Sequence, residues 1–170
     1  MKKTNEFLKE CLGDALLILM KKKPFSDITV SEVAALAQVS RSTYYRNFSS
    51  LEEVLLYRLN SLLHEWVTTQ STQTTQNETE IFISLFTYLM TIKEPLLLMT
   101  KANLEALLLT SFYQLLEADI TPEEEKYRQA YHSFGLTGII LSWIKRGLQE
   151  SPAQMAEILV QILAPFIHQT

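Results

Sequence analysis

The stretch that most constrains this chain runs from residue 29 to residue 48, where the sequence specifies two short helices joined by a tight turn. Thr29 and Glu32 have the spacing of a capping box, which predicts a helix that begins directly after Thr29. Ser40 predicts a second N-cap, followed by a helix over residues 41–47. Small alanines in the first of these helices allow the two helices to cross at close range.

The second helix has one apolar face and one polar face. Tyr44 and Phe48 are four residues apart, so they share a face that we expect to point inward. The remaining side chains are types that bond phosphate oxygens or base edges, and they predict a helix-turn-helix reader of the DNA major groove. The candidate contact residues are Thr29, Ser40, Arg41, Ser42, Thr43, Tyr45, Arg46 and Asn47. A surface hairpin with incidental polar residues is the alternative.

The same segment resembles the DNA-binding domain of the tetracycline-repressor (TetR) family of bacterial transcription regulators. The resemblance covers about residues 5–60 and rests on the two capped helices, the Val-Ser turn and the run Thr-Tyr-Tyr-Arg-Asn-Phe-Ser-Ser-Leu-Glu-Glu-Val-Leu. It implies an all-α fold of about nine helices, with a three-helix DNA-binding domain over residues 1–48 and a helical ligand-binding and dimerisation domain over residues 49–170. It also implies a homodimer that pairs through its last two helices and binds a palindromic operator.

Two positions depart from the pattern of that family. Gln38 stands in the turn where the family usually has glycine, so the turn either holds a non-glycine residue in a left-handed conformation or closes differently. Leu51 stands at the start of the fourth helix, where the family commonly has a phosphate-binding lysine. The resemblance therefore places backbone anchoring more heavily on Thr29, Tyr45 and Arg46.

Charge is distributed unevenly along the chain, whose formal net charge is −4. Residues 1–50 carry eight Lys or Arg and five Asp or Glu, a net of +3, whereas residues 51–170 carry seven and fourteen, a net of −7. The basic excess coincides with the predicted reader, which suits contact with DNA phosphates. The alternative is that a surplus of this size reflects only the random variation of charge along a sequence.

A content of only four glycines and five prolines favours helices over a turn-rich β fold.

Apolar periodicity and helix-breaking residues divide the rest of the chain into further helices. The sequence predicts a first helix over about residues 5–22. Because Pro95 breaks the chain, it predicts only a short sixth helix over residues 96–100. A seventh helix, over about residues 102–117, is apolar nearly all round, which is typical of a helix inside a core.

The last two helices are predicted over about residues 122–146 and 152–168, each with a capped start. Gly135 and Gly138 lie inside the first of them, where each costs roughly 1 kcal/mol relative to alanine, which indicates close helix contact or room for a ligand. The run that begins at Gly138, Gly-Ile-Ile-Leu-Ser-Trp-Ile-Lys-Arg-Gly-Leu-Gln-Glu-Ser-Pro, also resembles the carboxy-terminal region of a Gram-positive branch of the family.

The helical core is where the resemblance places an effector. Aromatic and soft side chains there suit an apolar ligand, and they equally suit an ordinary core. The candidate pocket residues are Trp66, Phe86, Met90, Met99, Phe112, Tyr113, Tyr131 and Trp143. We favour a repressor that leaves its operator when an effector binds. The alternatives are the same reader controlled by a protein partner, which includes activation, and a non-catalytic helical interaction protein.

The sequence indicates no enzyme, cofactor or metal site. His64, His132 and His168 do not have metal-binding spacing, and a glycine-rich phosphate loop is absent. Cys11 is the only cysteine, so an intramolecular disulfide is excluded and a core thiol is expected. No signal peptide precedes the first helix, and no apolar run approaches the roughly 18 residues needed to cross a bilayer. We therefore expect a cytoplasmic protein that binds double-stranded DNA and no membrane.

Overall fold

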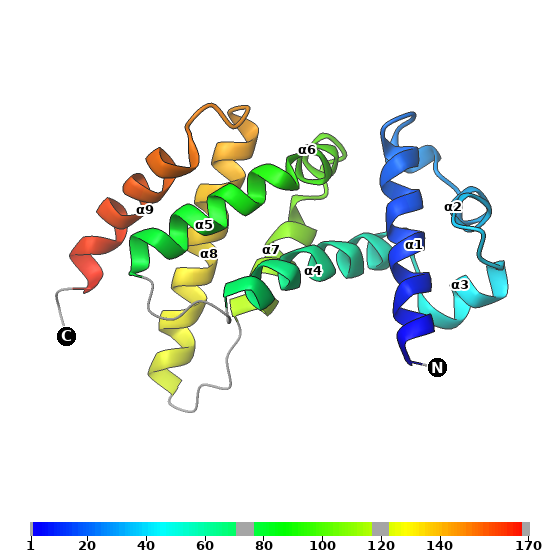
Figure 1. Cartoon of the computed structure of the whole chain (residues 1–170), viewed down its shortest axis with the longest axis horizontal. Coiled ribbons are helices and arrows are strands. Elements are labelled where there is room, and N and C mark those ends of the chain that lie inside the picture. Colours follow the sequence, from blue (N-terminus) through cyan, green and yellow to red (C-terminus); the bar gives the residue numbers. More distant parts are fainter. Residues whose placement is uncertain (1, 71–76, 117–122, 168–170) are drawn as a thin grey trace.

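The computed structural model describes residues 2–70, 77–116 and 123–167, and in these ranges the chain is helical with no strand. Figure 1 shows α1, α2 and α3 at one end and a larger helical body at the other, with α4 running between them. The expected all-α fold with about nine helices is confirmed. The helices are α1 Lys2–Met20, the 3₁₀ turn η1 Phe25–Asp27, α2 Val30–Leu36, α3 Arg41–Asn47, α4 Leu51–Gln70, α5 Glu78–Thr91, α6 Lys93–Lys101, α7 Glu105–Leu116, α8 Glu123–Lys145 and α9 Pro152–Ile167.

Side-chain caps determine where α2 and α3 begin. Thr29 Oγ1 accepts a hydrogen bond from the Glu32 N–H at 3.3 Å, while the Glu32 carboxylate accepts one from the Thr29 N–H at 2.9 Å. This reciprocal pair is the predicted capping box. Ser40 Oγ accepts from the Thr43 N–H at 3.1 Å and caps α3. Both helices therefore begin where the sequence predicts.

The end of α1 and the start of α6 differ from the predicted bounds. α1 ends at Met20 instead of residue 22, because the N–H groups of Lys22 and Lys23 both turn back to the Leu19 carbonyl, at 2.9 and 3.1 Å. α6 begins at Lys93, two residues before Pro95. The predicted break at this proline is wrong, because the first turn of a helix leaves its N–H groups without helical partners and so tolerates a residue that has none.

α7 is shorter and less enclosed than predicted. It begins at Glu105, since Asn103 adopts a left-handed φ of 57° that ends α6 just before it. Leu108 and Phe112 are buried, whereas Thr110 and Gln114 are exposed. α7 packs on both α4 and α8 and exposes a single stripe, at Ala106, Thr110 and Gln114, so the predicted place inside the core is confirmed except along that stripe.

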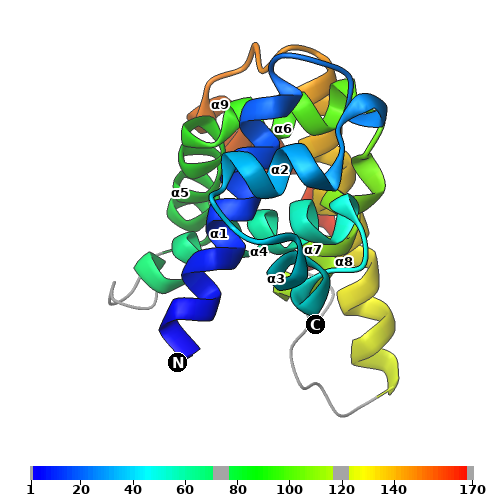
Figure 2. The same cartoon turned by 90° about the vertical axis from the view of Figure 1, so that its right-hand side faces the viewer.

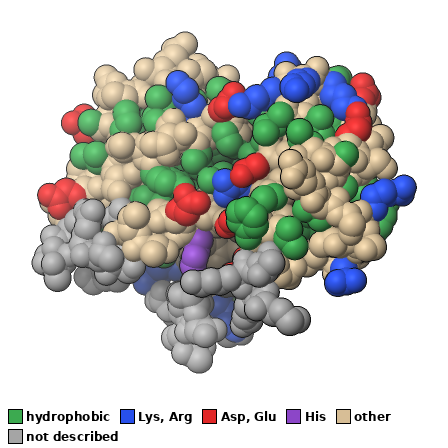
Figure 3. All heavy atoms as spheres, turned by 45° about the vertical axis from the view of Figure 1, so that its right-hand side comes forward, with side chains coloured by type: hydrophobic (Ala, Val, Ile, Leu, Met, Phe, Trp, Pro, Cys, Tyr) green, Lys and Arg blue, Asp and Glu red, His purple; other side chains and the backbone are tan. Residues whose placement is uncertain are grey.

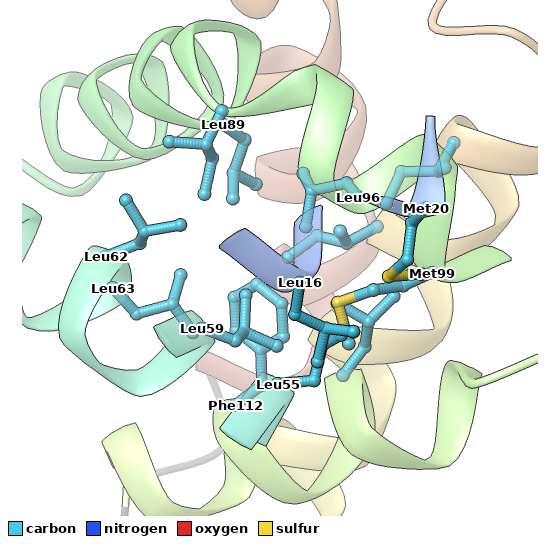
Figure 4. Close-up of a cluster of buried hydrophobic side chains, with 14 of the residues drawn as sticks. Leu16, Met20, Leu55, Leu59, Leu62, Leu63, Leu89, Leu96, Met99 and Phe112 are labelled. Atoms are coloured by element: carbon cyan, nitrogen blue, oxygen red, sulfur yellow. The ribbon is translucent and has the colours of Figure 1, made fainter. Parts of the chain in front are cut away.

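A continuous apolar core joins the narrow end of the molecule to the larger body. Leu12 and Leu16 of α1 are fully buried in it, and Leu55 and Leu59 of α4 are each only 2% exposed. Figure 4 shows Leu16, Leu55 and Phe112 converging on a common interior from three different helices. Because each such side chain contributes roughly 1.5–3 kcal/mol on burial, the packing of α1 on α4 is strongly stabilised.

Two ion pairs add polar connections between α1 and the body. Arg58 Nε of α4 donates to Asp14 Oδ1 of α1 at 2.7 Å. Lys21 Nζ, directly after α1, lies 2.7 Å from Glu94 Oε2 of α6. α1 is therefore linked to α4 near its middle and to α6 at its carboxyl end.

Within the described ranges, no single helix has both the length and the apolar content to cross a membrane. α5 and α6 meet these criteria only as a pair, across a bend of 69°. Leu85, Phe86 and Leu89 of α5 are buried in the core, as are Leu96 and Met99 of α6.

Candidate DNA-binding interface

α2, the turn after it and α3 form the end of the molecule farthest from α9. Figure 2 looks onto this end and shows α2 and α3 in front of α1. Val33 and Ala34 of α2 are buried behind this surface, and they leave the outer side of α3 open. The outer surfaces of α2 and α3 are therefore exposed at this end of the molecule.

The turn between α2 and α3 closes with a non-glycine residue in the left-handed region. Gln38 has a φ of 56°. Its N–H donates to the Ala35 carbonyl at 3.2 Å, and the Val39 N–H donates to the Ala34 carbonyl at 2.9 Å. These two bonds are those of a Schellman motif, the usual glycine-containing end of a helix. Of the two outcomes expected at this position, the structure has the left-handed one, and the geometry of the turn is preserved.

The inward face of α3 consists of the two predicted aromatic residues. Tyr44 is fully buried and Phe48 is 6% exposed, with ring centroids 6.1 Å apart. The predicted orientation of this face is confirmed. Among the described residues the Tyr44 hydroxyl has no hydrogen-bond partner, and burial raises the pKa of Tyr44 to about 12. Lys9 of α1 places its ammonium 5.8 Å from the centre of the Phe48 ring, which connects α3 to α1.

The outward face of α3 carries four exposed side chains, Arg41, Ser42, Tyr45 and Arg46. The Arg41 guanidinium lies 6.0 Å from the centre of the Tyr45 ring. Among the described residues, no carboxylate lies within 4.0 Å of either arginine. Two unneutralised guanidiniums and a phenol therefore lie on one exposed helical surface, where they can donate hydrogen bonds to phosphate oxygens or base edges.

The other predicted contact residues already make hydrogen bonds within the chain. Asn47 Nδ2 donates to the Thr43 carbonyl at 2.8 Å, and both residues are half-buried. Thr29 Oγ1 lies 2.8 Å from Glu32 Oε2, and Ser40 Oγ lies 2.8 Å from Thr43 Oγ1. These residues stabilise the helix starts, so any DNA contact through their hydroxyl or amide groups would be shared with a capping role.

Glu32 is part of a small charged cluster behind the capping box. Lys23 Nζ lies 2.7 and 2.8 Å from its two carboxylate oxygens. These bonds, together with those from Thr29, lower the pKa of Glu32 to about 2. The carboxylate that fixes the start of α2 therefore stays ionised over the ordinary pH range.

The eight candidate pocket residues do not line one cavity. Phe86, Met99, Phe112 and Trp143 are buried, and the rings of Phe86 and Trp143 meet edge to face at 5.3 Å. Tyr131 is 57% exposed. The remaining three, Trp66, Met90 and Tyr113, are half-buried. Most of the set is thus packed as core or spread over its margin, and its role in ligand binding stays a prediction.

A polar hollow between α4 and α7 lies outside the set of residues expected from the sequence. It encloses about 190 Å³ and is lined in part by Asn60 and His64 of α4 and by Ser111 and Gln114 of α7. Asn60 Nδ2 donates to Gln114 Oε1 at 2.9 Å across it. The Ser111 hydroxyl is buried and has no hydrogen-bond partner among the residues that the structure describes. The spacing of Asn60 and His64, four residues apart on one helix, is the only sequence signal that could have indicated it.

α8 and α9 present apolar side chains on the part of the molecule opposite α3. α8 packs on α7 and α9 packs on α5, which leaves an outer surface on each helix. Gly135 and Gly138 lie on the outer surface of α8, where an added Cβ would meet nothing within 4 Å. The described part of the chain therefore does not provide the close helix contact expected at these glycines. The exposed large apolar residues of these two helices are Tyr127, Tyr131, Phe134, Ile158 and Ile162.

Comparisons with known proteins agree with this arrangement. Residues 76–165, more than half of the chain, match a TetR family model described as the transcriptional regulator C-terminal region. Among solved structures, the chain is similar to the Dihydroxyacetone kinase operon activator DhaS with a TM-score of 0.61, and the alignment covers 94% of this chain and 96% of that one. Sequence identity to DhaS is 19%, so this likeness concerns the fold. No curated protein matches the sequence.

Proposed function

Since this chain belongs to the TetR family of transcriptional regulators, we propose that it binds DNA in a sequence-specific manner through α3. The observation that carries this proposal is the exposed surface with Arg41 and Arg46, neither of which has a carboxylate partner among the described residues. Arginine bonds guanine edges and phosphates in bidentate fashion, and a short exposed helix fits the major groove. Thr29, Ser40, Ser42, Thr43, Tyr45 and Asn47 complete the proposed contact set.

The proposed DNA-binding form is a homodimer that pairs through α8 and α9. The exposed apolar residues on these helices and the open surface at Gly138 support this pairing. A two-fold dimer presents two copies of α3 to two half-sites, and a palindromic operator has the same symmetry. The pairing surface and α3 lie at opposite ends of the protomer (Figure 1), so pairing leaves the reader accessible.

Control by an effector in the helical core is the favoured form of regulation. The effector would bind more tightly to a dimer conformation in which the distance between the two copies of α3 does not fit the operator. It would thereby lower the affinity for DNA. The hollow between α4 and α7 supports this idea, because α4 also carries α3 at its start. In this form the protein acts as a repressor.

A second candidate is a DNA reader whose core is controlled by a protein partner and that activates transcription. The name of the DhaS protein describes an activator, and that protein has the same fold. The dense packing of Phe86, Phe112 and Trp143 where an apolar ligand is expected also favours control from the surface. Two experiments separate the candidates. A metabolite that raises the melting temperature in a thermal-shift screen would favour the effector, whereas a specific protein captured in a pull-down from lysate would favour the protein partner.

The test of DNA reading is the affinity for the intergenic DNA next to the gene, measured at several salt concentrations. We expect affinity to fall steeply as salt rises, with clear preference over bulk DNA. Arg46→Ala removes a proposed contact and should reduce specific affinity by roughly 1–3 kcal/mol without changing thermal stability. Lys93→Ala, at an exposed position of α6 away from both α3 and the proposed pairing surface, is the control and should leave affinity unchanged. Equal affinity of the Arg46→Ala and native proteins would refute the assignment of α3.

The test of pairing is sedimentation of the native protein and of Gly138→Arg at micromolar concentration. We expect a native dimer and a folded monomeric variant, because a long charged side chain would occupy the open surface of α8. Loss of DNA binding should accompany loss of the dimer. A native monomer that stays monomeric with operator DNA would contradict the proposed pairing.

A further inference from the structure

A hollow of about 620 Å³ lies where α1 and α6 end, and we call it the α1–α6 hollow. Its walls come from two units of the molecule, the end that carries α1, α2 and α3 and the larger helical body. Residues 20–26 line it from the DNA-binding end, and Leu98 and residues 101–103 line it from the body. A molecule bound there would contact both units, and the volume lies within the range of small-molecule sites.

The α1–α6 hollow is rich in lysine. Lys21, Lys22, Lys23 and Lys101 all line it. Figure 3 shows Lys and Arg side chains gathered along the upper right edge of the face that it presents, near the top of the molecule where these helices end. The whole chain carries a net charge of −4, so this concentration of cations runs against its overall balance.

Two of the four lysines are neutralised and two are not. Lys21 pairs with Glu94 at 2.7 Å, and Lys23 pairs with Glu32 at the same distance. Among the described residues, no carboxylate lies within 4.0 Å of Lys22 or Lys101. The hollow therefore retains two positive charges, one from each unit.

The carbonyl groups at the two helix ends do not account for these charges. Cations often compensate the last carbonyls of a helix. Here the Leu19 carbonyl already accepts two backbone N–H groups at the end of α1. At the end of α6 the carbonyls of Leu98, Met99 and Thr100 also accept backbone bonds, from residues 102–104. The lysines are therefore not required as caps.

Apolar side chains lie beside the lysines. Met20 is buried, and Phe25, Leu98 and Ala102 are half-buried at the wall of the hollow. A ring or short hydrocarbon chain can cover these side chains while its charged group reaches the ammonium groups. The combination suits an amphipathic anion better than an inorganic ion alone.

We propose that the α1–α6 hollow binds a small organic dianion, of the class of aryl or alkyl phosphate monoesters, between Lys22 and Lys101. A phosphate monoester carries nearly two negative charges at neutral pH and accepts several charge-assisted hydrogen bonds. Its charge matches the two lysines that have no carboxylate partner among the described residues. DNA is a poor candidate for this site, because the hollow lies between α1 and the body, whereas α3 faces away from the body (Figure 1).

The experiment is calorimetric titration of the full chain, without DNA, with phenyl phosphate, inorganic phosphate and phenol at pH 7.5 and fixed ionic strength. Phenyl phosphate carries both the dianion and the apolar group, so we expect saturable binding that is strongest for this probe. Because no DNA is present, failure of this binding is distinct from failure of the proposed regulatory function. Phenol that binds as tightly as phenyl phosphate would overturn the proposal.

Variants test whether the ligand bridges the two units. Lys22→Gln and Lys101→Gln should each weaken phenyl phosphate binding by roughly five- to tenfold, since each removes one charge-assisted contact. Lys93→Gln is the matched control, because Lys93 and Lys101 are both exposed on α6 with no carboxylate within 4.0 Å among the described residues, and Lys93 does not line the hollow. Circular dichroism checks that the exposed substitutions leave the fold intact. If either variant binds as tightly as the native chain, the ligand does not bridge the units and the proposal is wrong.

Discussion

Gly13 of α1 lies directly against Arg58 of α4. A Cβ placed on Gly13 would lie 2.6 Å from the Cβ and 2.8 Å from the Cγ of Arg58. Real Cβ atoms do not approach other carbons so closely, so this glycine sets how near the two helices can come. The same arginine donates to Asp14 at 2.7 Å, which ties the crossing of α1 and α4 to one side chain.

Gly13→Ala should therefore destabilise the protein although alanine is the better helix former. Overpacking costs about 1–3 kcal/mol, and the gain in helix propensity is about 1 kcal/mol, so we expect a net loss of roughly 1 kcal/mol in the free energy of unfolding. Gly135→Ala is the control, because nothing among the described residues lies within 4 Å of a Cβ added there. Urea denaturation of both variants is the measurement, and a stabilised Gly13→Ala protein would contradict the contact.

The adjacent tyrosines of α3 should respond in opposite ways to the loss of a hydroxyl. Tyr44→Phe removes a buried hydroxyl that has no hydrogen-bond partner in the described part of the chain, so we expect the free energy of unfolding to rise by about 1 kcal/mol with DNA affinity unchanged. Tyr45→Phe removes an exposed hydroxyl and should leave stability unchanged but weaken DNA binding. Thermal unfolding and a DNA titration on the same two proteins test both statements. A destabilised Tyr44→Phe protein would show that the hydroxyl has a partner after all.

Gln38→Gly should stabilise the turn between α2 and α3. The left-handed conformation at this position costs a residue with a Cβ roughly 1–2 kcal/mol, whereas glycine adopts it freely but loses more chain entropy on folding. We expect a net gain of about 0.5–1 kcal/mol in the free energy of unfolding. Chemical denaturation measures it, with Gln149→Gly, outside the helices, as the comparison. A less stable Gln38→Gly protein would mean that the glutamine side chain makes an unrecognised contribution.

Low pH should reduce the stability of the folded protein, partly through Glu32. Its folded pKa of about 2 lies below the ordinary value of 4.5, so the unfolded chain binds this proton first as the pH falls. The stabilisation is fully present above pH 4.5 and is lost progressively toward pH 2. Glu32→Gln should therefore show a smaller drop in melting temperature between about pH 6 and about pH 3 than the native protein. Glu6→Gln, at an exposed position of α1, is the control and should follow the native curve.

The limits of prediction from sequence follow from the kind of signal at each residue. α2 and α3 are predicted correctly because caps such as Thr29 and Ser40 act locally and leave a direct pattern in the sequence. The prediction at Pro95 is wrong because the effect of a proline depends on its position within the helix, and that position depends on the preceding residues. The left-handed outcome at Gln38 and the contact of Gly13 with Arg58 depend on three-dimensional packing. For the same reason, composition does not distinguish core aromatic residues from residues that line a cavity.

α4 spans 20 residues without interruption, from just after α3 into the middle of the body. A helix of that length is about 30 Å long, so a rotation of about 6° about one end displaces the other by about 3 Å. That displacement is close to the rise of one base pair, about 3.4 Å. In a symmetric dimer, each copy of α3 would shift by this amount. The distance between the two copies of α3 would then no longer match the distance between two half-sites along the DNA. In the dimer that we propose, a tilt of this size would therefore be large enough to decide whether both half-sites can be bound at once.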